Sequence, residues 1–92
     1  MPKLSESAIT DALKQLPGWQ RQGNAIQRVF EFSAFLAGIE FVNRVALAAE
    51  EANHHPDITI NYNKVTMALT SHDSGGVTER DVKMAQRITQ LA

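Results

Sequence analysis

The feature that most constrains this chain is the absence of cysteine from a sequence of only 92 residues. A chain of this length has surface for one hydrophobic core, so we expect a single domain over residues 1–92. The apolar area buried in such a core barely offsets the conformational entropy lost on folding, and small proteins therefore add disulfides, a metal or a subunit interface. Without cysteine, disulfides and thiolate-bound zinc are both excluded. The sequence therefore predicts a homo-oligomer.

The charge balance argues against nucleic acid as a partner. Nine Lys and Arg residues stand against ten Asp and Glu residues, the formal net charge is -1, and no basic run occurs. Residues 1–10 lack the apolar segment of a signal peptide, and no apolar stretch is long enough to span a bilayer. We therefore expect a cytoplasmic protein with neither a nucleic-acid nor a membrane partner.

Apolar residues at helical spacing predict a first helix that begins after Ser5, its N-cap, and stops at Pro17-Gly18. Two short runs rich in aromatic and β-branched residues follow, at 19–21 and 25–32. The turn residues Gln22-Gly23-Asn24 separate them, so the two runs predict a β-hairpin.

The longest periodic segment, Ala34 to Asn53, predicts a helix capped by Ser33. Its apolar positions form two neighbouring stripes, the first made of Phe35, Ile39, Val42, Ala46 and Ala49 and the second of Phe41, Val45, Ala48 and Ala52. A helix with so wide an apolar face contacts more than one neighbour. We expect one side to cover a sheet and the other to meet a second subunit.

Two more strands are predicted at 57–62 and 64–71, where apolar residues alternate with polar or small ones. The break at Tyr62-Asn63 fits either a tight hairpin or a longer crossing connection. Thr78, with Asp81 three residues on, marks the start of a last helix. The order αββαββα predicts an α+β fold in two layers, an antiparallel four-stranded sheet with three helices packed on one face.

All three histidines lie between residues 54 and 72, outside the core-spaced positions of the predicted helices. His54 and His55 lie where the long helix ends, and Pro56 prevents the helix from continuing. If the helix persists to His54, Glu50 shares its face. A carboxylate beside an imidazole favours the charged ring and fixes which nitrogen carries the proton, so this pair could act as an oriented general acid or base.

Two other interpretations of the histidines stay open. A helix C-terminus attracts cations, so a histidine there can be an ordinary capping residue. Three histidines with Asp57 or Glu50 could also bind zinc. However, neither His-x-x-x-His nor His-Glu-x-x-His occurs, and adjacent side chains seldom converge on one ion. Metal catalysis is therefore the weaker hypothesis.

Two aromatic residues, Trp19 and Tyr62, also have two interpretations. A lone Trp is usually part of the core, and a Tyr at a strand end is usually half-buried packing. Either ring could instead form a flat wall for a heteroaromatic ligand.

The order and spacing of seven residues form a specific pattern: Glu50, then His54-His55-Pro56, then Tyr62, His72 and Asp81. This pattern resembles the signature of the pterin-4a-carbinolamine dehydratases, a family in which a vertebrate member also serves as dimerisation cofactor of a homeodomain transcription factor. Residues 17–19, 41–46, 62–65 and 78–81 look like family segments as well, so the resemblance covers nearly the whole chain.

The resemblance implies an αββαββα fold whose sheets join across a homodimer, with homotetramers in some members. It implies the dehydration of 4a-hydroxytetrahydrobiopterin to quinonoid dihydropterin and water during tetrahydropterin recycling, without a metal or another cofactor. His54, His55 and His72 would be the catalytic and pterin-binding histidines, with Glu50 as their acidic partner. The positions implied in substrate binding are Trp19, Asn53, Pro56, Tyr62 and Asp81.

One position departs from the family pattern. The residue before the histidine doublet is often Asp in the family, whereas here it is Asn53. An amide cannot act as a charge partner, although it can still form hydrogen bonds.

The residue types suit this reaction. Loss of the 4a-hydroxyl needs one proton delivered to the leaving group and one removed from a ring nitrogen, and histidine can do either near neutral pH. We expect one of His54 and His55 to protonate the hydroxyl while the other histidines hold the pterin and accept the second proton. Two alternatives remain. One is a protein-binding module acting as a dimerisation or transcriptional cofactor through the helix at 34–53. The other is a pterin-related activity in molybdopterin metabolism.

Overall fold

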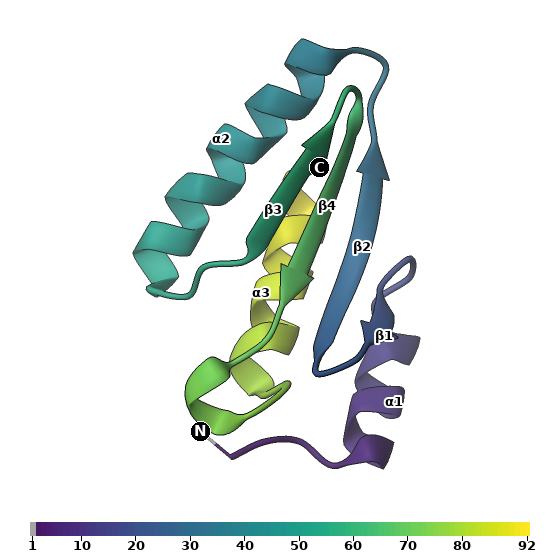
Figure 1. Cartoon of the computed structure of the whole chain (residues 1–92), viewed down its shortest axis with the longest axis vertical. Coiled ribbons are helices and arrows are strands. Elements are labelled where there is room, and N and C mark those ends of the chain that lie inside the picture. The colour runs from purple at the N-terminus through teal and green to yellow at the C-terminus, as the bar shows by residue number, and fades with distance from the viewer. Residues whose placement is uncertain (1) are drawn as a thin grey trace.

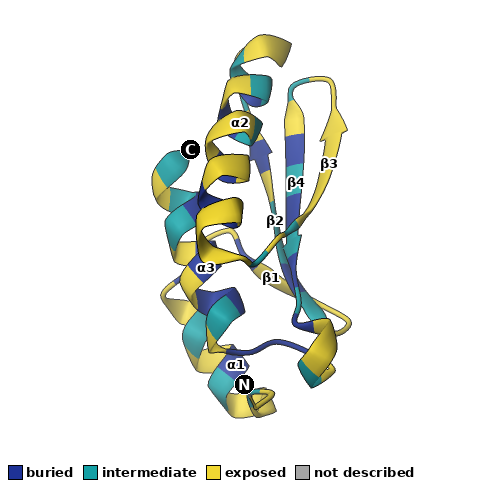
Figure 2. Cartoon of the chain, turned by 90° about the vertical axis from the view of Figure 1, so that its left-hand side faces the viewer, coloured by how far each residue is buried: buried dark blue, intermediate teal, exposed yellow. Residues whose placement is uncertain are grey.

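The computed structural model describes residues 2–92, which form two layers with a sheet on one side and helices on the other (Figures 1 and 2). In chain order the elements are α1 (Glu6–Lys14), β1 (Gln20–Gln22), β2 (Ala25–Glu31), α2 (Phe35–Ala52), β3 (Asp57–Asn61), β4 (Lys64–Leu69), the 3-10 turn η1 (His72–Ser74) and α3 (Glu79–Leu91). The strands form one antiparallel sheet in the order β1-β2-β4-β3. The predicted α+β fold and its αββαββα order are confirmed.

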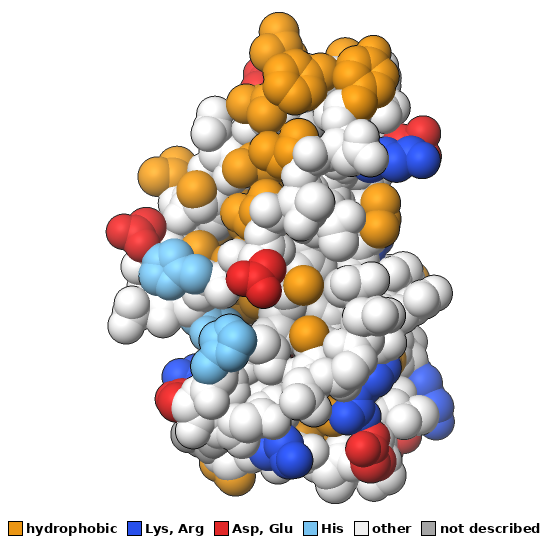
Figure 3. Space-filling model, in the orientation of Figure 1, with side chains coloured by type: hydrophobic (Ala, Val, Ile, Leu, Met, Phe, Trp, Pro, Cys, Tyr) orange, Lys and Arg blue, Asp and Glu red, His pale blue; other side chains and the backbone are white. Residues whose placement is uncertain are grey.

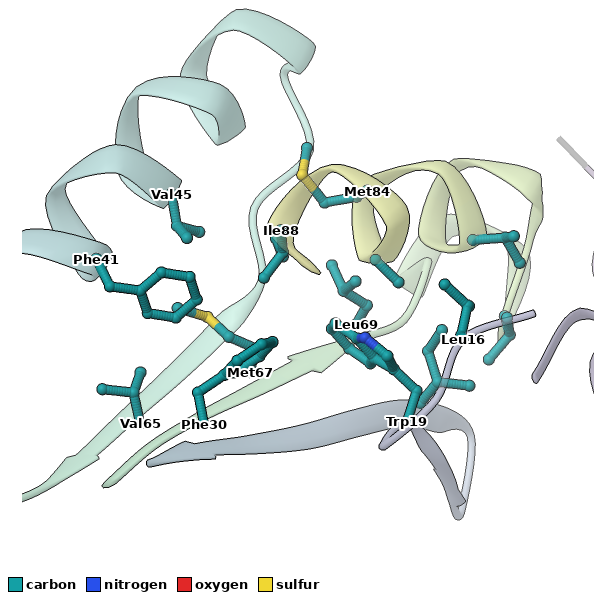
Figure 4. Packing of buried hydrophobic residues seen from close by; sticks show 14 of the residues in the cluster. Leu16, Trp19, Phe30, Phe41, Val45, Val65, Met67, Leu69, Met84 and Ile88 are labelled. Carbon is teal, nitrogen blue, oxygen red and sulfur yellow. The ribbon is translucent and has the colours of Figure 1, made fainter. Parts of the chain in front are cut away.

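The core lies between the helices and one face of the sheet (Figure 4). Side chains alternate between the two faces of a strand, so every second residue of β4 points toward the helices. These residues, Val65, Met67 and Leu69, have no exposed surface. The core is completed from the other elements by Ile26, Phe30, Phe41, Val45, Val82, Ala85 and Ile88. The alternation in the sequence therefore identifies the covered face of the sheet correctly.

The long helix α2 buries one part of its apolar surface and exposes another. Phe41, Val45 and Ala48 of the second stripe are buried against the sheet and α3. Outside this contact, α2 exposes Leu36 and Leu47 by 69% and 75%. The edge strand β3 is likewise exposed along its length (Figure 2). The expectation that one side of α2 covers the sheet is confirmed, and the contact of the other side with a second subunit stays a prediction.

Both ends of α2 differ from the prediction. The N-cap is Ala34, which has extended dihedral angles and no side-chain oxygen, so the predicted cap at Ser33 is wrong. The helix ends at Ala52, because Asn53 adopts the left-handed conformation with φ 50° and ψ 43°. Asparagine tolerates this conformation better than most residues and commonly ends helices in this way. The chain therefore changes direction one residue before the histidine doublet.

The two hairpins have tight turns. Gln22 pairs with Ala25, so the β1–β2 turn contains only Gly23 and Asn24, and Gln22 belongs to the strand rather than to the predicted turn. The β3–β4 connection is a tight hairpin with Asn61 paired to Lys64, which decides between the two connections that the sequence allows.

The starts of α1 and α3 agree with the predicted caps. Ser5 Oγ accepts a hydrogen bond from the Ala8 N–H at 3.1 Å, and Thr78 with Asp81 forms a capping box at the start of α3. Among residues 2–92, the helices are all too short or too polar to cross a membrane.

Candidate active site

The left-handed turn at Asn53 places the histidine doublet at the end of α2. His54 still donates its backbone N–H to the Ala49 carbonyl at 3.1 Å, but its side chain no longer follows the helix face of Glu50. The His54 side chain is only 12% exposed, whereas that of His55 is 54% exposed. The two neighbouring rings therefore lie in different environments.

His54 is paired with Asp81 of α3. Its Nε2 lies 2.6 Å from Asp81 Oδ1, and the Asp81 side chain has no exposed surface. The predicted pairing of His54 with Glu50 is therefore wrong, because it required the helix to continue through residue 54. Only the packing of α3 beside the end of α2 brings Asp81 within reach (Figure 1).

Glu50 instead binds the second histidine. Its Oε2 lies 2.5 Å from His55 Nε2, and both side chains are well exposed. Because the turn at Asn53 redirects the chain, His55 returns toward the last turn of α2. Each histidine of the doublet thus has a carboxylate partner of its own.

Asp81 is held by a buried hydrogen-bond network. Its Oδ2 accepts from the Ser71 hydroxyl at 2.9 Å and from the Thr78 backbone N–H at 2.8 Å. The Thr78 and Ser71 hydroxyl oxygens are 2.9 Å apart. Since the Ser71 hydrogen is used on Asp81, Thr78 donates to Ser71, and its own oxygen accepts from the Arg80 N–H at 3.2 Å. The capping box of α3 therefore also orients a histidine.

Ser71 is the residue of this network that sequence reasoning missed. It has 2% exposed surface and ends the run of alternating residues that includes β4. The available signal was weak, because a serine after a strand is usually a turn residue. The capping box at Thr78 and Asp81 was visible in the sequence, but its second role was not.

Each of the two carboxylates determines which ring nitrogen of its histidine carries a hydrogen. An ionised carboxylate only accepts hydrogen bonds, so Nε2 of His54 and of His55 must carry a hydrogen. In the neutral ring the lone pair is then on Nδ1. Each carboxylate also balances the positive charge of its ring when the ring is protonated. Nδ1 is thus the ring nitrogen of either histidine that its carboxylate leaves free.

His72 completes a site with the doublet. It begins η1 after β4, and its side chain is exposed and makes no hydrogen bond to another residue that the structure describes. The three histidines border one open depression of about 320 Å³, which is lined by Asn53, His54, His55, Thr70, Ser71, His72, Asp73 and Arg80. Histidine side chains gather on the corresponding part of the surface in Figure 3. Small-molecule sites have volumes of roughly 300–1,000 Å³, so this one is at the lower limit.

Trp19 differs from the expectation that it lines the pocket. It is 4% exposed, its Nε1 donates to Thr89 Oγ1 at 2.9 Å, and its ring meets Phe30 edge-on at 6.1 Å. Figure 4 shows the ring among the core side chains. Trp19 is therefore a core residue in this chain, because its indole N–H finds a partner inside the helix layer.

The four other predicted binding residues fall in different places. Tyr62 is 69% exposed in the β3–β4 turn, at the end of β3 opposite to Pro56, and a strand of five residues separates the two by about 17 Å. Asp81 has no surface through which to touch a ligand, and it contacts His54 instead. Asn53 does line the depression, whereas Pro56 does not.

Metal binding needs side chains that converge on one point. Among residues 2–92, no three His, Asp or Glu side chains are arranged so that they could hold a metal ion. Two ring nitrogens of the doublet are already engaged by carboxylates. The geometry fits proton exchange better than coordination.

The carboxyl of Asp73, at the rim of the depression, should have a pKa below the ordinary value for Asp. The Arg80 guanidinium donates to Asp73 Oδ1 at 2.7 Å, and this hydrogen bond lowers the pKa of the Asp73 carboxyl. A lowered folded-state pKa means that the pair stabilises the fold above the ordinary Asp pKa, and that this stability is lost as pH falls through the lowered value. Carboxyl-carbon NMR titration should show the pKa of Asp73 rising in Arg80→Gln.

The matched reference for this titration is Glu6, whose pKa is lowered by its own hydrogen bond from Arg21. The Glu6 titration should be unchanged in Arg80→Gln. An Asp73 titration that is equally unchanged would contradict the assignment of the shift to Arg80.

Comparison with known proteins identifies the family of the chain. The family model "Pterin 4 alpha carbinolamine dehydratase" matches residues 2–91. A Thermomicrobium roseum protein named "Putative pterin-4-alpha-carbinolamine dehydratase" is 50% identical over 92 residues, which is 100% of this chain and 99% of that protein. The crystal structure of a transcriptional coactivator/pterin dehydratase from Brucella melitensis superposes with a TM-score of 0.94 at 40% identity, covering 98% of each chain.

A more distant structure shares the fold alone. It is a pterin dehydratase-like protein identified as a RuBisCO assembly factor in the alpha-carboxysome, and it superposes with a TM-score of 0.72 at 24% identity over 82% of this chain and 89% of that one. The match of the family model over nearly the whole chain and the identity to full-length relatives lead to one conclusion. The chain belongs to the pterin 4 alpha carbinolamine dehydratase family.

Proposed function

We propose that this protein is a hydro-lyase that converts 4a-hydroxytetrahydrobiopterin to quinonoid dihydropterin and water. The observation that carries the proposal is the set of three histidines around one depression, two of them held by carboxylates through Nε2. The reaction needs one proton donor and one proton acceptor at the same ring system, and this arrangement supplies both.

In the proposed step the C4a–O bond breaks and the oxygen leaves as water after it receives a proton. The N5 lone pair forms the C4a=N5 double bond, and the N5 proton is taken by a base. One proton enters and one proton leaves, and no electron is gained or lost. The chemistry therefore requires neither a metal nor an organic cofactor, and we expect none.

His54 is the best candidate for the proton donor. Its ring is mostly buried, and the hydrogen bond to Asp81 fixes the ring, so the orientation of Nδ1 toward a substrate is fixed as well. His55 and His72 are more exposed and border the same depression from the segment after α2 and from η1. We assign them to holding the pterin and accepting the second proton, with Glu50 orienting His55.

The test is the decay of freshly generated 4a-hydroxytetrahydropterin, followed by stopped-flow absorbance after the protein has been treated with a chelator. The wild-type protein should accelerate the decay, and His72→Ala should reduce the acceleration by at least about tenfold, the lower range of a lost acid, base or positioning contribution. Lys64→Gln, an exposed change in β4, serves as the control and should retain full activity. A folded wild-type protein that leaves the decay unchanged would rule out the dehydratase assignment.

Self-association and localisation remain parts of this proposal. The exposed apolar residues of α2 and the open edge at β3 support a homodimer or homotetramer, because a core of this size gains stability from a subunit interface. The same surface is the feature that favours a role as a protein-binding cofactor if the enzyme assay fails. The near-neutral charge balance supports a protein without a nucleic-acid partner, and the cytoplasmic location stays a prediction.

A further inference from the structure

A second depression lies beside the first and shares two residues with it. Its volume is about 210 Å³, and its walls are Ala52, His54, Arg80, Lys83, Met84 and Arg87. His54 and Arg80 line both depressions, so the two meet at the buried histidine. A ligand that reaches Nδ1 of His54 from the histidine-lined side therefore has a neighbouring space into which a substituent can extend.

The walls of the second depression carry positive charge. Arg80, Lys83 and Arg87 follow each other at i, i+3 and i+7 on α3, which places them on one stripe of the helix. No Asp or Glu lines the depression. Like charges at this spacing weaken a helix, so the stripe does not serve the stability of α3.

The three cations differ in how far they are already neutralised. Arg87 pairs with Glu51 at 2.8 Å, and Arg80 pairs with Asp73 at 2.7 Å. Lys83 is exposed and forms no ion pair with another of residues 2–92. In addition, the Nε of Arg80 is buried and has no hydrogen-bond partner within the described chain. The positive charge of Lys83 and the Nε donor of Arg80 are therefore left without a partner in the part of the chain that the structure describes.

The remaining wall is apolar. Met84 is 3% exposed, and Ala52 adds a methyl group from the last turn of α2. A group that fits here is short, with an apolar base and a negatively charged end that reaches the rim. The charged rim and apolar base of the second depression suit an anionic substituent on a larger ring. The ring itself would occupy the adjoining, histidine-lined depression.

We propose that this second depression binds an anionic substituent on C6 of the pterin. The inference rests on the proposed function, because it takes the pterin ring to lie against the three histidines. In a pterin, C6 is joined to C4a through N5 alone, so a ring whose C4a faces His54 places its C6 substituent next to the shared wall. The inference therefore extends the substrate class from the neutral biopterin to pterins with a phosphate or carboxylate on the side chain, with Lys83 as the main charge partner.

The test compares three stable ligands by isothermal titration calorimetry at low ionic strength. They are 6-hydroxymethyl-7,8-dihydropterin, its monophosphate and 6-carboxy-7,8-dihydropterin, which share the ring and differ in the charge of the substituent. We expect at least one anionic ligand to bind about tenfold more tightly than the neutral one, as one charge-assisted contact would provide. In Lys83→Gln this preference should fall to about threefold or less, because Gln keeps the helix but removes the charge.

Two controls separate the inference from the proposed function. Lys64→Gln removes a lysine from β4 and should leave the preference for the anion unchanged. Higher salt should reduce the preference in the wild-type protein, because screening weakens exposed charge pairs. Equal binding of the neutral and anionic ligands, or a preference that survives in Lys83→Gln, would overturn the inference. The dehydration assay with a neutral pterin measures the proposed function separately, so that function stands or falls on its own result.

Discussion

Replacement of His54 by alanine should reduce the acceleration of 4a-hydroxytetrahydropterin decay by about 10²–10⁴-fold, the usual contribution of a positioned acid or base. The reason is that His54 combines a mostly buried ring, a fixed tautomer and a place on the shared wall of both depressions. Stopped-flow absorbance measures the effect. Added imidazole should restore part of the rate, because the variant leaves a space that a free ring can fill.

A second variant separates proton transfer from positioning. In His54→Gln the side-chain amide can still donate a hydrogen bond to Asp81 but cannot exchange a proton, so the fold should be retained and the rate should stay low. A His54→Gln protein with more than about half of the wild-type rate would exclude His54 as a proton carrier. In that case His55 would become the candidate, since its Nε2 is also held by a carboxylate, that of Glu50.

The largest effect on stability should come from Asp81→Ala, which we expect to lower the free energy of unfolding by about 3–5 kcal/mol. The substitution removes the acceptor of three hydrogen bonds, from His54 Nε2, Ser71 Oγ and the Thr78 N–H, all at a site without exposed surface. It also removes half of the capping box of α3. Domains of this size have a free energy of unfolding of about 5–15 kcal/mol, so the loss is a large fraction of the total.

Urea unfolding at a fixed protein concentration measures this change, because self-association would make the apparent stability concentration-dependent. Glu79→Ala is the matched control. Glu79 is also an acidic residue in the first turn of α3, but it is exposed, so its loss should cost less than about 1 kcal/mol. Equal effects of the two substitutions would show that Asp81 acts only as a helix-end charge.

Asp81→Asn tests the link between stability and catalysis. The amide has nearly the same shape as the carboxylate. However, the carboxylate accepts hydrogen bonds at both oxygens, whereas the amide has one acceptor oxygen and one NH₂ donor. One of the hydrogen bonds from His54, Ser71 or Thr78 must be lost or reversed. If the bond to His54 is reversed, the ring adopts the other tautomer and Nδ1 carries the hydrogen, so the rate should fall more than the stability does.

Local patterns in the sequence were sufficient for the order of the helices and strands. The helices and strands follow from the period of their apolar residues, and the starts of α1 and α3 follow from caps at Ser5 and Thr78. These signals are short-range. Backbone geometry alone sets the spacing of apolar residues in a helix and in a strand, and it also sets how far a capping side chain can reach. The errors lie at element boundaries, such as the N-cap of α2, which is Ala34 instead of Ser33, and Gln22, which belongs to β1 instead of the turn.

The candidate site could be predicted only in part. The concentration of histidines after α2 was visible, and His54, His55 and His72 do border one depression. The sequence could not show whether Trp19 lies in the core or lines the pocket. An aromatic residue near a strand has the same local sequence pattern in both cases, and only the structure shows that Trp19 is buried.

The sequence by itself determined the order of elements and the position of the histidine doublet. Only the tertiary structure decided which carboxylate each histidine contacts. Glu50 is near His54 in sequence, yet the left-handed residue Asn53 ends the helix and turns the chain, so Glu50 meets His55. Asp81 reaches His54 across 27 residues because the core packs the end of α2 against the start of α3. Helix periodicity specifies neighbours one turn apart, whereas a partner on another element depends on how the apolar faces pack together.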